Sequence, residues 1–188
     1  SHLRVSLEER IESFELVSQR VFELVEKHIP GARLPFGEPY PWYVLIETAG
    51  GPDELQDALA EEARQEILLD AVIAKNAREA DELWRLRHSI SEAERQDGVA
   101  LKHDVSVPLS RMQEFLQRGD DLLASLRPDL ELVAFGHVGD GNLHYNVVLP
   151  ATLAPDAWRM EGERITRAIY DLVSELGGSF SAEHGVGQ

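Results

Sequence analysis

Apolar residues along this chain follow two spacings, one typical of strands and one typical of helices. Runs in which apolar positions alternate or lie together between turn residues predict strands over 11–17, 43–47, 103–107, 132–135 and 143–149. Apolar positions that recur every three or four residues predict helices after Val17 and from Pro52, Asn76, Ser110 and Pro155. The helix from Asn76 has a capping-box-like start, with Glu79 three residues later, and is expected to end near Gly98. β-Branched residues gather in the second half of residues 67–74, which favours a further strand there.

Residues 132–149 predict a β-hairpin. Asp140-Gly141 is a strong signal for a two-residue turn, and it lies between two strand-like runs. With these two residues as the loop, His137 stands directly across from His144, at a Cβ separation of about 4.5–5.5 Å. Two imidazoles at that separation are close enough to share a metal ion. The alternative is a solvated histidine pair with no ligand.

The two faces of this hairpin differ in polarity. One face is largely apolar and suits covering helices; it carries Leu132, Ala134, Val138, Leu143, Tyr145, Val147 and Leu149. The other face begins apolar and becomes polar towards the turn, where both histidines lie. Together with the alternating strands and helices, the pattern predicts a single α+β domain over residues 1–188. We expect a largely antiparallel sheet of ferredoxin-like type, with helices packed on one face.

Composition narrows the range of partners. The 188 residues include 18 Lys+Arg and 34 Asp+Glu, a net charge of −16, which argues against a surface for nucleic acid or anionic membrane. No apolar run approaches the ~20 residues of a membrane span, and the first residues lack the features of a signal peptide. The chain has no cysteine, so any metal must use His, Asp or Glu, and we expect a cytoplasmic location.

Residues 179–187 offer a carboxylate beside a histidine, Glu183-His184, followed by glycines that let the backbone turn. Two histidines and one glutamate are enough to hold zinc and leave positions open for a substrate. His137, His144 and Glu183 are therefore a candidate metal shell. A solvated turn is the alternative interpretation of Glu183-His184.

A candidate anion site consists of Arg87, Ser91 and Lys102. Arg87 lies at the edge of the apolar stripe of its predicted helix, and Ser91 follows one turn later on the same face. Arginine favours two-point recognition of a carboxylate, and lysine adds a point charge. Alternatively, the Arg87 side chain extends over the core with its head group in water, or nearby glutamates satisfy it.

Four segments carry a shared signature: WRLRHSISE at 84–92, KHDVSVP at 102–108, GHVGDGNLH at 136–144 and SAEHGVG at 181–187. Together they closely resemble the C-terminal substrate (cap) domain of FAD-linked oxidases. This family of flavoproteins includes D-2-hydroxyglutarate dehydrogenase, D-lactate dehydrogenase and the glycolate oxidase flavin subunit. The likeness covers most of the chain from about Tyr43 onward, in the family's order.

The resemblance implies a metal centre and a base. His137, His144 and Glu183 would be ligands of a divalent metal, usually zinc, that holds the carboxylate and the hydroxyl of the substrate. His184 would be the base that removes the hydroxyl proton while a hydride leaves for the flavin. A metal that lowers the pKa of the alcohol and a neutral histidine that accepts its proton are chemically consistent with this role.

The resemblance also implies which groups hold the rest of the substrate. Arg87, Ser91 and Lys102 are similar to the groups that hold the distal carboxylate in enzymes acting on D-2-hydroxyglutarate, and Asn146 matches another substrate-side position. A dicarboxylate would use Arg87 and Lys102, whereas lactate has no second carboxylate to offer them. The favoured substrate is therefore similar to D-2-hydroxyglutarate, with D-lactate and glycolate as alternatives.

In the family, an N-terminal domain supplies most of the FAD contacts, and no glycine-rich diphosphate loop is recognisable in this chain. We therefore expect an excised or truncated piece of a larger enzyme, inactive alone because no electron acceptor would be held at the substrate carbon.

Two other classes of protein stay open. A stand-alone metal hydrolase would use the same His137, His144 and Glu183 shell with His184 as base, and it predicts hydrolysis by this chain alone. A non-catalytic interaction domain predicts no tight metal site. Arg87, Ser91 and Lys102 favour the dehydrogenase, because a hydrolase needs no clamp for a distal carboxylate.

Overall fold

The computed structural model describes residues 10–49, 51–97 and 100–180. Its strands form a seven-stranded sheet in the order β2-β1-β5-β6-β4-β7, with β3 also paired to β6, and every pairing is antiparallel. The strands are β1 Ile11–Ser18, β2 Trp42–Thr48, β3 Ala100–Leu101, β4 Asp104–Ser106, β5 Glu131–His137, β6 Asn142–Val148 and β7 Ser179–Phe180. The predicted α+β class with a largely antiparallel sheet is confirmed.

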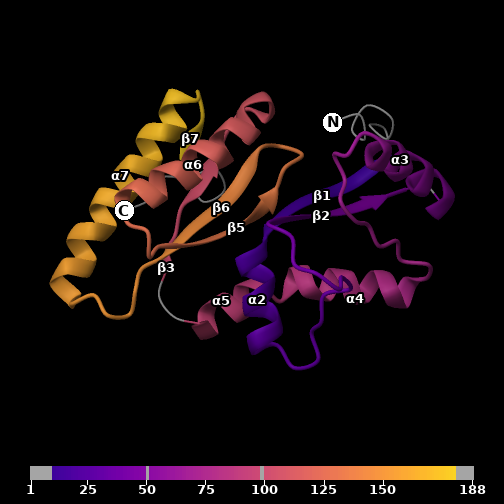
Figure 1. Cartoon of the computed structure of the whole chain (residues 1–188), viewed down its shortest axis with the longest axis horizontal. Helices are drawn as coiled ribbons and strands as arrows, with labels where there is room; N and C mark the ends of the chain where they lie inside the picture. The colour runs from indigo at the N-terminus through magenta and orange to yellow at the C-terminus, as the bar shows by residue number, and fades with distance from the viewer. Residues whose placement is uncertain (1–9, 50, 98–99, 181–188) are drawn as a thin grey trace.

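The helices are α2 Gln19–His28, α3 Pro52–Arg64, α4 Ala77–His88, α5 Ile90–Asp97, α6 Met112–Leu126 and α7 Pro155–Glu175, with a short 3-10 turn at Leu109–Arg111. As predicted, α6 and α7 cover the face of the hairpin that carries Ala134 and Tyr145 (Figure 1). On the opposite face, α2, α4 and α5 form a second core around Val133 and Phe135. Helices thus cover this second face as well, where the base of the hairpin is apolar.

Most elements form close to their predicted bounds. α4 begins after Asn76, whose side-chain oxygen accepts the Glu79 N–H at 3.1 Å, so the expected cap is present. Ser89 separates α4 from α5 where one longer helix was predicted. α7 ends at Glu175, and Gly177 just beyond it has a φ of 75°. The N–H of the next residue, Gly178, donates to the Val173 carbonyl at 2.8 Å, which closes the helix end.

The strand predicted in the second half of residues 67–74 is wrong. This segment has no helix or strand, and its apolar side chains Ile67, Leu69 and Val72 are 59%, 74% and 44% exposed. β-Branched residues favour a strand mainly by packing against cross-strand and same-face neighbours. At this exposure they lack a packed face, so composition alone gave the wrong prediction.

The predicted register of the β5–β6 hairpin is wrong by two residues. Phe135, not His137, pairs with His144, and the loop has four residues, 138–141. His137 is therefore a diagonal neighbour of His144. Because side chains alternate with a period of two, the shift leaves both histidines on one face.

Neighbouring segments explain the wider loop. The Val138 N–H donates to the Phe14 carbonyl on β1 at 3.0 Å, and the Val107 N–H donates to the Gly141 carbonyl at 3.0 Å. Both ends of the loop are thus bonded to chain outside the hairpin. A turn signal within the hairpin cannot report these bonds.

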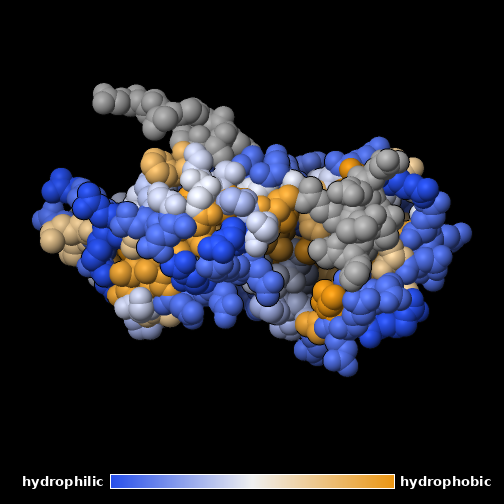
Figure 2. All heavy atoms as spheres, turned by 90° about the horizontal axis from the view of Figure 1, so that it is seen from above, coloured by the Kyte–Doolittle hydropathy of each residue, from blue (hydrophilic) through white to orange (hydrophobic). Residues whose placement is uncertain are grey.

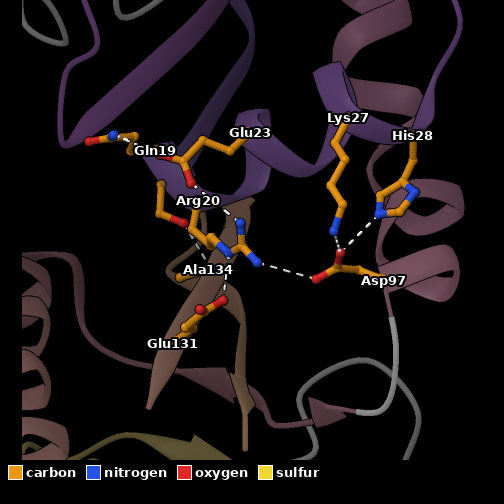
Figure 3. Close-up of polar contacts among 9 residues, drawn as sticks. Gln19, Arg20, Glu23, Lys27, His28, Asp97, Glu131 and Ala134 are labelled. Atoms are coloured by element: carbon orange, nitrogen blue, oxygen red, sulfur yellow. Dashed lines mark hydrogen bonds and ion pairs between the residues drawn. The ribbon is translucent and has the colours of Figure 1, made fainter. Parts of the chain in front are cut away.

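A charged network ties α2 to α5 and β5 on the second face (Figure 3). The Asp97 carboxylate, at the end of α5, contacts Lys27 at 2.5 Å, His28 at 2.9 Å and Arg20 at 3.3 Å, and its side chain is 11% exposed. Arg20 also reaches Glu131 at 2.7 Å, at the start of β5. Hydrogen bonds from His28 and then Lys27 lower the pKa of Asp97 against the opposing effect of burial.

Tight packing joins α6 to the sheet on the first face. A Cβ on Gly119 would lie 2.4 Å from the hydroxyl oxygen of Tyr145, a fully buried residue of β6. That hydroxyl has no hydrogen-bond partner among the described residues. Burial therefore strongly raises the pKa of Tyr145 and keeps the phenol neutral.

The surface agrees with the composition. Figure 2 shows hydrophilic side chains over most of the face seen from above, with apolar residues exposed in separate patches. None of the helices between residues 10 and 180 that the structure describes has the length and apolar character needed to cross a membrane.

The contact between α6 and β6 predicts a coupled pair of substitutions. Gly119→Ala should lower the free energy of unfolding by about 1–3 kcal/mol, because overpacking against Tyr145 outweighs the gain in helix propensity. In a Tyr145→Phe background the same substitution should cost less than half as much, since the clashing oxygen is gone. Urea denaturation of the four proteins measures both costs, and equal costs in the two backgrounds would contradict this packing.

The Asp97 network predicts a pH-dependent loss of stability. A carboxyl whose pKa is lowered by folding stabilises the protein above its unfolded pKa of about 3.9, and this contribution is lost as the pH falls through the folded value. Asp97→Asn should therefore cost about 1 kcal/mol at pH 7, and the difference from wild type should shrink as the pH falls below about 4. Chemical denaturation across this pH range tests it; Asp129→Asn, which removes an exposed pair with Arg127, is the control and should have a much smaller effect.

Candidate functional site

Four side chains form a row across four neighbouring strands. Glu15 on β1 pairs directly with His137 on β5, and His144 on β6 pairs directly with Asp104 on β4. The order β1-β5-β6-β4 brings the two pairs side by side, and directly paired residues share a face of the sheet. A small hollow lined by both histidines and Asp104 lies between them.

Each histidine of this row is held by a carboxylate through the same ring nitrogen. Nδ1 of His144 lies 2.5 Å from Oδ1 of Asp104, and Nδ1 of His137 contacts Oε1 of Glu15. An ionised carboxylate only accepts hydrogen bonds, so a neutral ring in either pair carries its proton on Nδ1. Nε2 of each ring then carries no hydrogen, and its lone pair is available to a metal ion.

The two histidines have the surroundings that are usual for metal ligands. Histidine ligands of metals usually give their second nitrogen to a carboxylate, which fixes the ring and raises its basicity, and Glu15 and Asp104 occupy those positions. In the described chain, no three His, Cys, Asp or Glu side chains cluster so as to hold a metal. Glu183, the predicted third ligand, and His184, the predicted base, lie outside the described residues.

Arg87 lies beside the row and shares one of its carboxylates. Its Nε is 2.8 Å from Oε2 of Glu15, and its guanidinium carbon lies 5.1 Å from the centre of the Phe135 ring. The ion pair and the cation–π contact together fix the plane of the guanidinium. No hydrogen bond engages the terminal nitrogens within the part of the chain that the structure describes, so the predicted role as a carboxylate clamp is compatible with this geometry.

A second buried carboxylate, Glu94 of α5, holds two more of the predicted site residues. Its Oε1 accepts from the Asn146 side-chain amide at 2.6 Å, and its Oε2 lies 3.1 Å from the Lys102 ammonium. Lys102 is largely exposed, whereas Asn146 and Glu94 are buried. Lys102 and Asn146 are thus brought together on one carboxylate.

His103 fixes the chain between Lys102 and Asp104. Its buried ring donates from Nδ1 to the Tyr145 carbonyl at 2.8 Å, and its Nε2 lies 2.9 Å from the Thr166 hydroxyl on α7. Burial lowers the pKa of His103 more than the hydrogen bond to the carbonyl raises it. The neutral ring therefore acts as a structural support that holds Lys102 and Asp104 in place.

Ser91 lies on a different helix from Arg87, whereas the sequence predicted one helix for both. It lies in the first turn of α5, beyond the break at Ser89, and is exposed. Within residues 10–180, apart from the undescribed gaps, no side-chain hydrogen bond joins Ser91 to Arg87.

Sequence reasoning missed Glu15 and Glu94. Each carries a weak signal, because a charged residue stands where its element is otherwise buried. Glu15 precedes the buried residues Leu16 and Val17 of β1, and Glu94 follows Ile90 by one helical turn on the buried side of α5. A carboxylate in such a position needs a partner, although the sequence does not say which.

Comparison with known proteins identifies close relatives. The D-2-hydroxyglutarate dehydrogenase of Xanthomonas citri pv. viticola is 40% identical over 183 residues, which cover 95% of this chain and 38% of that protein. The mitochondrial D-2-hydroxyglutarate dehydrogenase of Bos taurus is 36% identical over 190 residues, 98% of this chain and 33% of that protein. A putative mitochondrial D-lactate dehydrogenase of Schizosaccharomyces pombe is 32% identical over 205 residues, 100% of this chain and 37% of that protein.

The chain thus spans between 33% and 38% of the length of these relatives. The model of one protein family, described as FAD linked oxidases, C-terminal domain, matches residues 2–188. Since this match runs along almost the whole sequence, the chain belongs to the family of FAD linked oxidases, C-terminal domain.

Proposed function

We propose that this chain is the substrate- and metal-binding domain of an FAD-dependent dehydrogenase that oxidises a D-2-hydroxy acid to the 2-oxo acid. The observation that carries the proposal is the pair of carboxylate-backed histidines, His137 and His144, with the anchored Arg87 beside them. The relatives named D-2-hydroxyglutarate dehydrogenase support the choice of reaction. FAD would be held mainly by another domain of the full-length protein, and we expect a cytoplasmic location.

The proposed metal, zinc or another divalent ion, would be held by His137, His144 and Glu183. β7 ends at Phe180, opposite Val105 and one residue from Asp104. Glu183 follows Phe180 by three residues, a reach of at most about 11 Å. The chain length therefore allows this carboxylate to join the two histidines.

When bound, the metal would lower the pKa of the substrate hydroxyl, and FAD would accept the hydride. His184 takes the hydroxyl proton as the oxygen–hydrogen and carbon–hydrogen bonds break and the carbon–oxygen double bond forms. The residues of this chain orient the acid for that step. Arg87 and Lys102 hold the far end of the substrate, with Asn146 and Ser91 as further contacts.

A dicarboxylate such as D-2-hydroxyglutarate suits this arrangement better than D-lactate or glycolate. Arg87 uses Nε for Glu15 and keeps its terminal nitrogens, which match the two oxygens of a carboxylate. Lys102 gives one of its three donors to Glu94 and is otherwise exposed. A monocarboxylate bound at the metal would leave both cations without a ligand.

Zinc titration tests the metal half of the proposal. Calorimetry of the chelator-stripped chain should show about one tight site, weakened in His144→Ala by more than the about 10–100-fold loss typical of a supporting residue. His88→Ala, which removes an exposed histidine stacked on Trp84, should bind zinc as the wild type does. Unchanged binding by His144→Ala would contradict the site, and zinc-dependent ester hydrolysis by the chain alone would favour the hydrolase instead.

Substrate kinetics of the full-length protein test the carboxylate half. Lys102→Met should lower kcat/KM for D-2-hydroxyglutarate about 10–100-fold, the loss expected for one hydrogen bond to a charged group. It should change kcat/KM for D-lactate little, because D-lactate has no distal carboxylate. Lys75→Met, at an exposed lysine before the start of α4, is the matched control. An equal loss with both substrates would remove Lys102 from the clamp.

A further inference from the structure

Glu15 is a carboxylate in an unusual place. It lies in β1, between β2 and β5 in the sheet, and only 1% of its side chain is exposed. A charged carboxylate withdrawn from water is costly unless it is paired and hydrogen-bonded. The partners of Glu15 therefore indicate why it is there.

Its two oxygens serve two different partners. Oε2 accepts from Nε of Arg87 at 2.8 Å, and Oε1 contacts Nδ1 of His137. The Ser13 hydroxyl adds a longer contact to Oε1 at 3.4 Å. Glu15 thus joins the end of α4 to the end of β5, segments about 50 residues apart along the chain.

We infer that Glu15 is a positioning residue shared by the metal half and the carboxylate half of the site. It holds His137 as the tautomer protonated on Nδ1, with Nε2 free to bind a metal, and it holds Arg87 with its terminal nitrogens available. The purpose of this arrangement rests on the proposed function, whereas the tautomer follows from the geometry alone. Both Glu15 oxygens are engaged by these two partners, so the role assigned to Glu15 is to hold them rather than to bind substrate or metal.

Replacing Glu15 by glutamine separates its contact with Arg87 from its contact with His137. The amide has one accepting oxygen and one donating nitrogen, so it satisfies only one of two donors. Arg87 cannot lose its proton, whereas a neutral histidine can move its proton from Nδ1 to Nε2. In Glu15→Gln the amide oxygen should therefore face Arg87, and the amide nitrogen should face an unprotonated Nδ1 of His137. The Nε2 of His137 would then carry hydrogen and be unable to bind zinc.

Long-range ¹H–¹⁵N NMR of the histidine rings tests this at about pH 8, above the ordinary pKa of histidine. In the wild-type chain, His137 should be the Nδ1-protonated tautomer, and in Glu15→Gln it should be mainly the Nε2-protonated one. His103, whose Nδ1 donates to the Tyr145 carbonyl, should keep its tautomer in both proteins. Glu94→Gln, a change at the other buried carboxylate, should leave His137 unaltered.

Either of two spectra would overturn the inference. One is an Nε2-protonated His137 in the wild-type chain, which requires no variant to fold. The other is an unchanged His137 in a folded Glu15→Gln.

Zinc binding separates this inference from the proposed function. If both hold, Glu15→Gln should raise the zinc Kd about 10–100-fold, as loss of a supporting carboxylate does. A switched tautomer in a chain that binds no zinc supports the role of Glu15 and overturns the metal half of the proposed function. Tight zinc binding that Glu15→Gln leaves unchanged supports the metal site and overturns the role of Glu15.

Discussion

Charged groups withdrawn from water must be paired, and this constraint organises the polar end of the sheet. Glu15 and Glu94 are both buried, and each carboxylate takes two partners from other elements. The partners are the groups that sequence reasoning selected as site residues: an arginine, a histidine, a lysine and an amide. Their positions depend on these two carboxylates, because a buried charge that lost its partners would destabilise the fold.

The order of the strands makes this pairing available. β1 lies next to β5 although 112 residues lie between the end of β1 at Ser18 and the start of β5 at Glu131, and β4 lies next to β6 on the far side of the hairpin. Each histidine of the hairpin therefore meets a carboxylate from a strand that flanks the hairpin. The hairpin supplies the imidazoles, and its neighbours determine which ring nitrogen carries hydrogen.

The features that the sequence predicted correctly are those that depend on the spacing of residues within one element. The apolar face of the hairpin, the position of Arg87 at the edge of a buried stripe and the Asn76 cap all follow from spacing within one element, and all are present. The predicted hairpin register was wrong, because Val138 donates to the Phe14 carbonyl and Gly141 accepts from Val107, so both ends of the loop are bonded to chain outside the hairpin. Long-range pairing also explains why Glu15 and Glu94 were missed, since each is recognisable only beside its partners.

Net charge alone would make this chain a poor receptor for an anion. At −16 it repels anionic ligands at long range, but salt limits that repulsion to about 8 Å under physiological conditions. Recognition then depends on local geometry. Arg87 meets Glu15 through Nε, which fixes the guanidinium plane and keeps the terminal nitrogens available. Because folding has already ordered this side chain, a bound carboxylate need not order it again, which favours affinity despite the neighbouring negative charge.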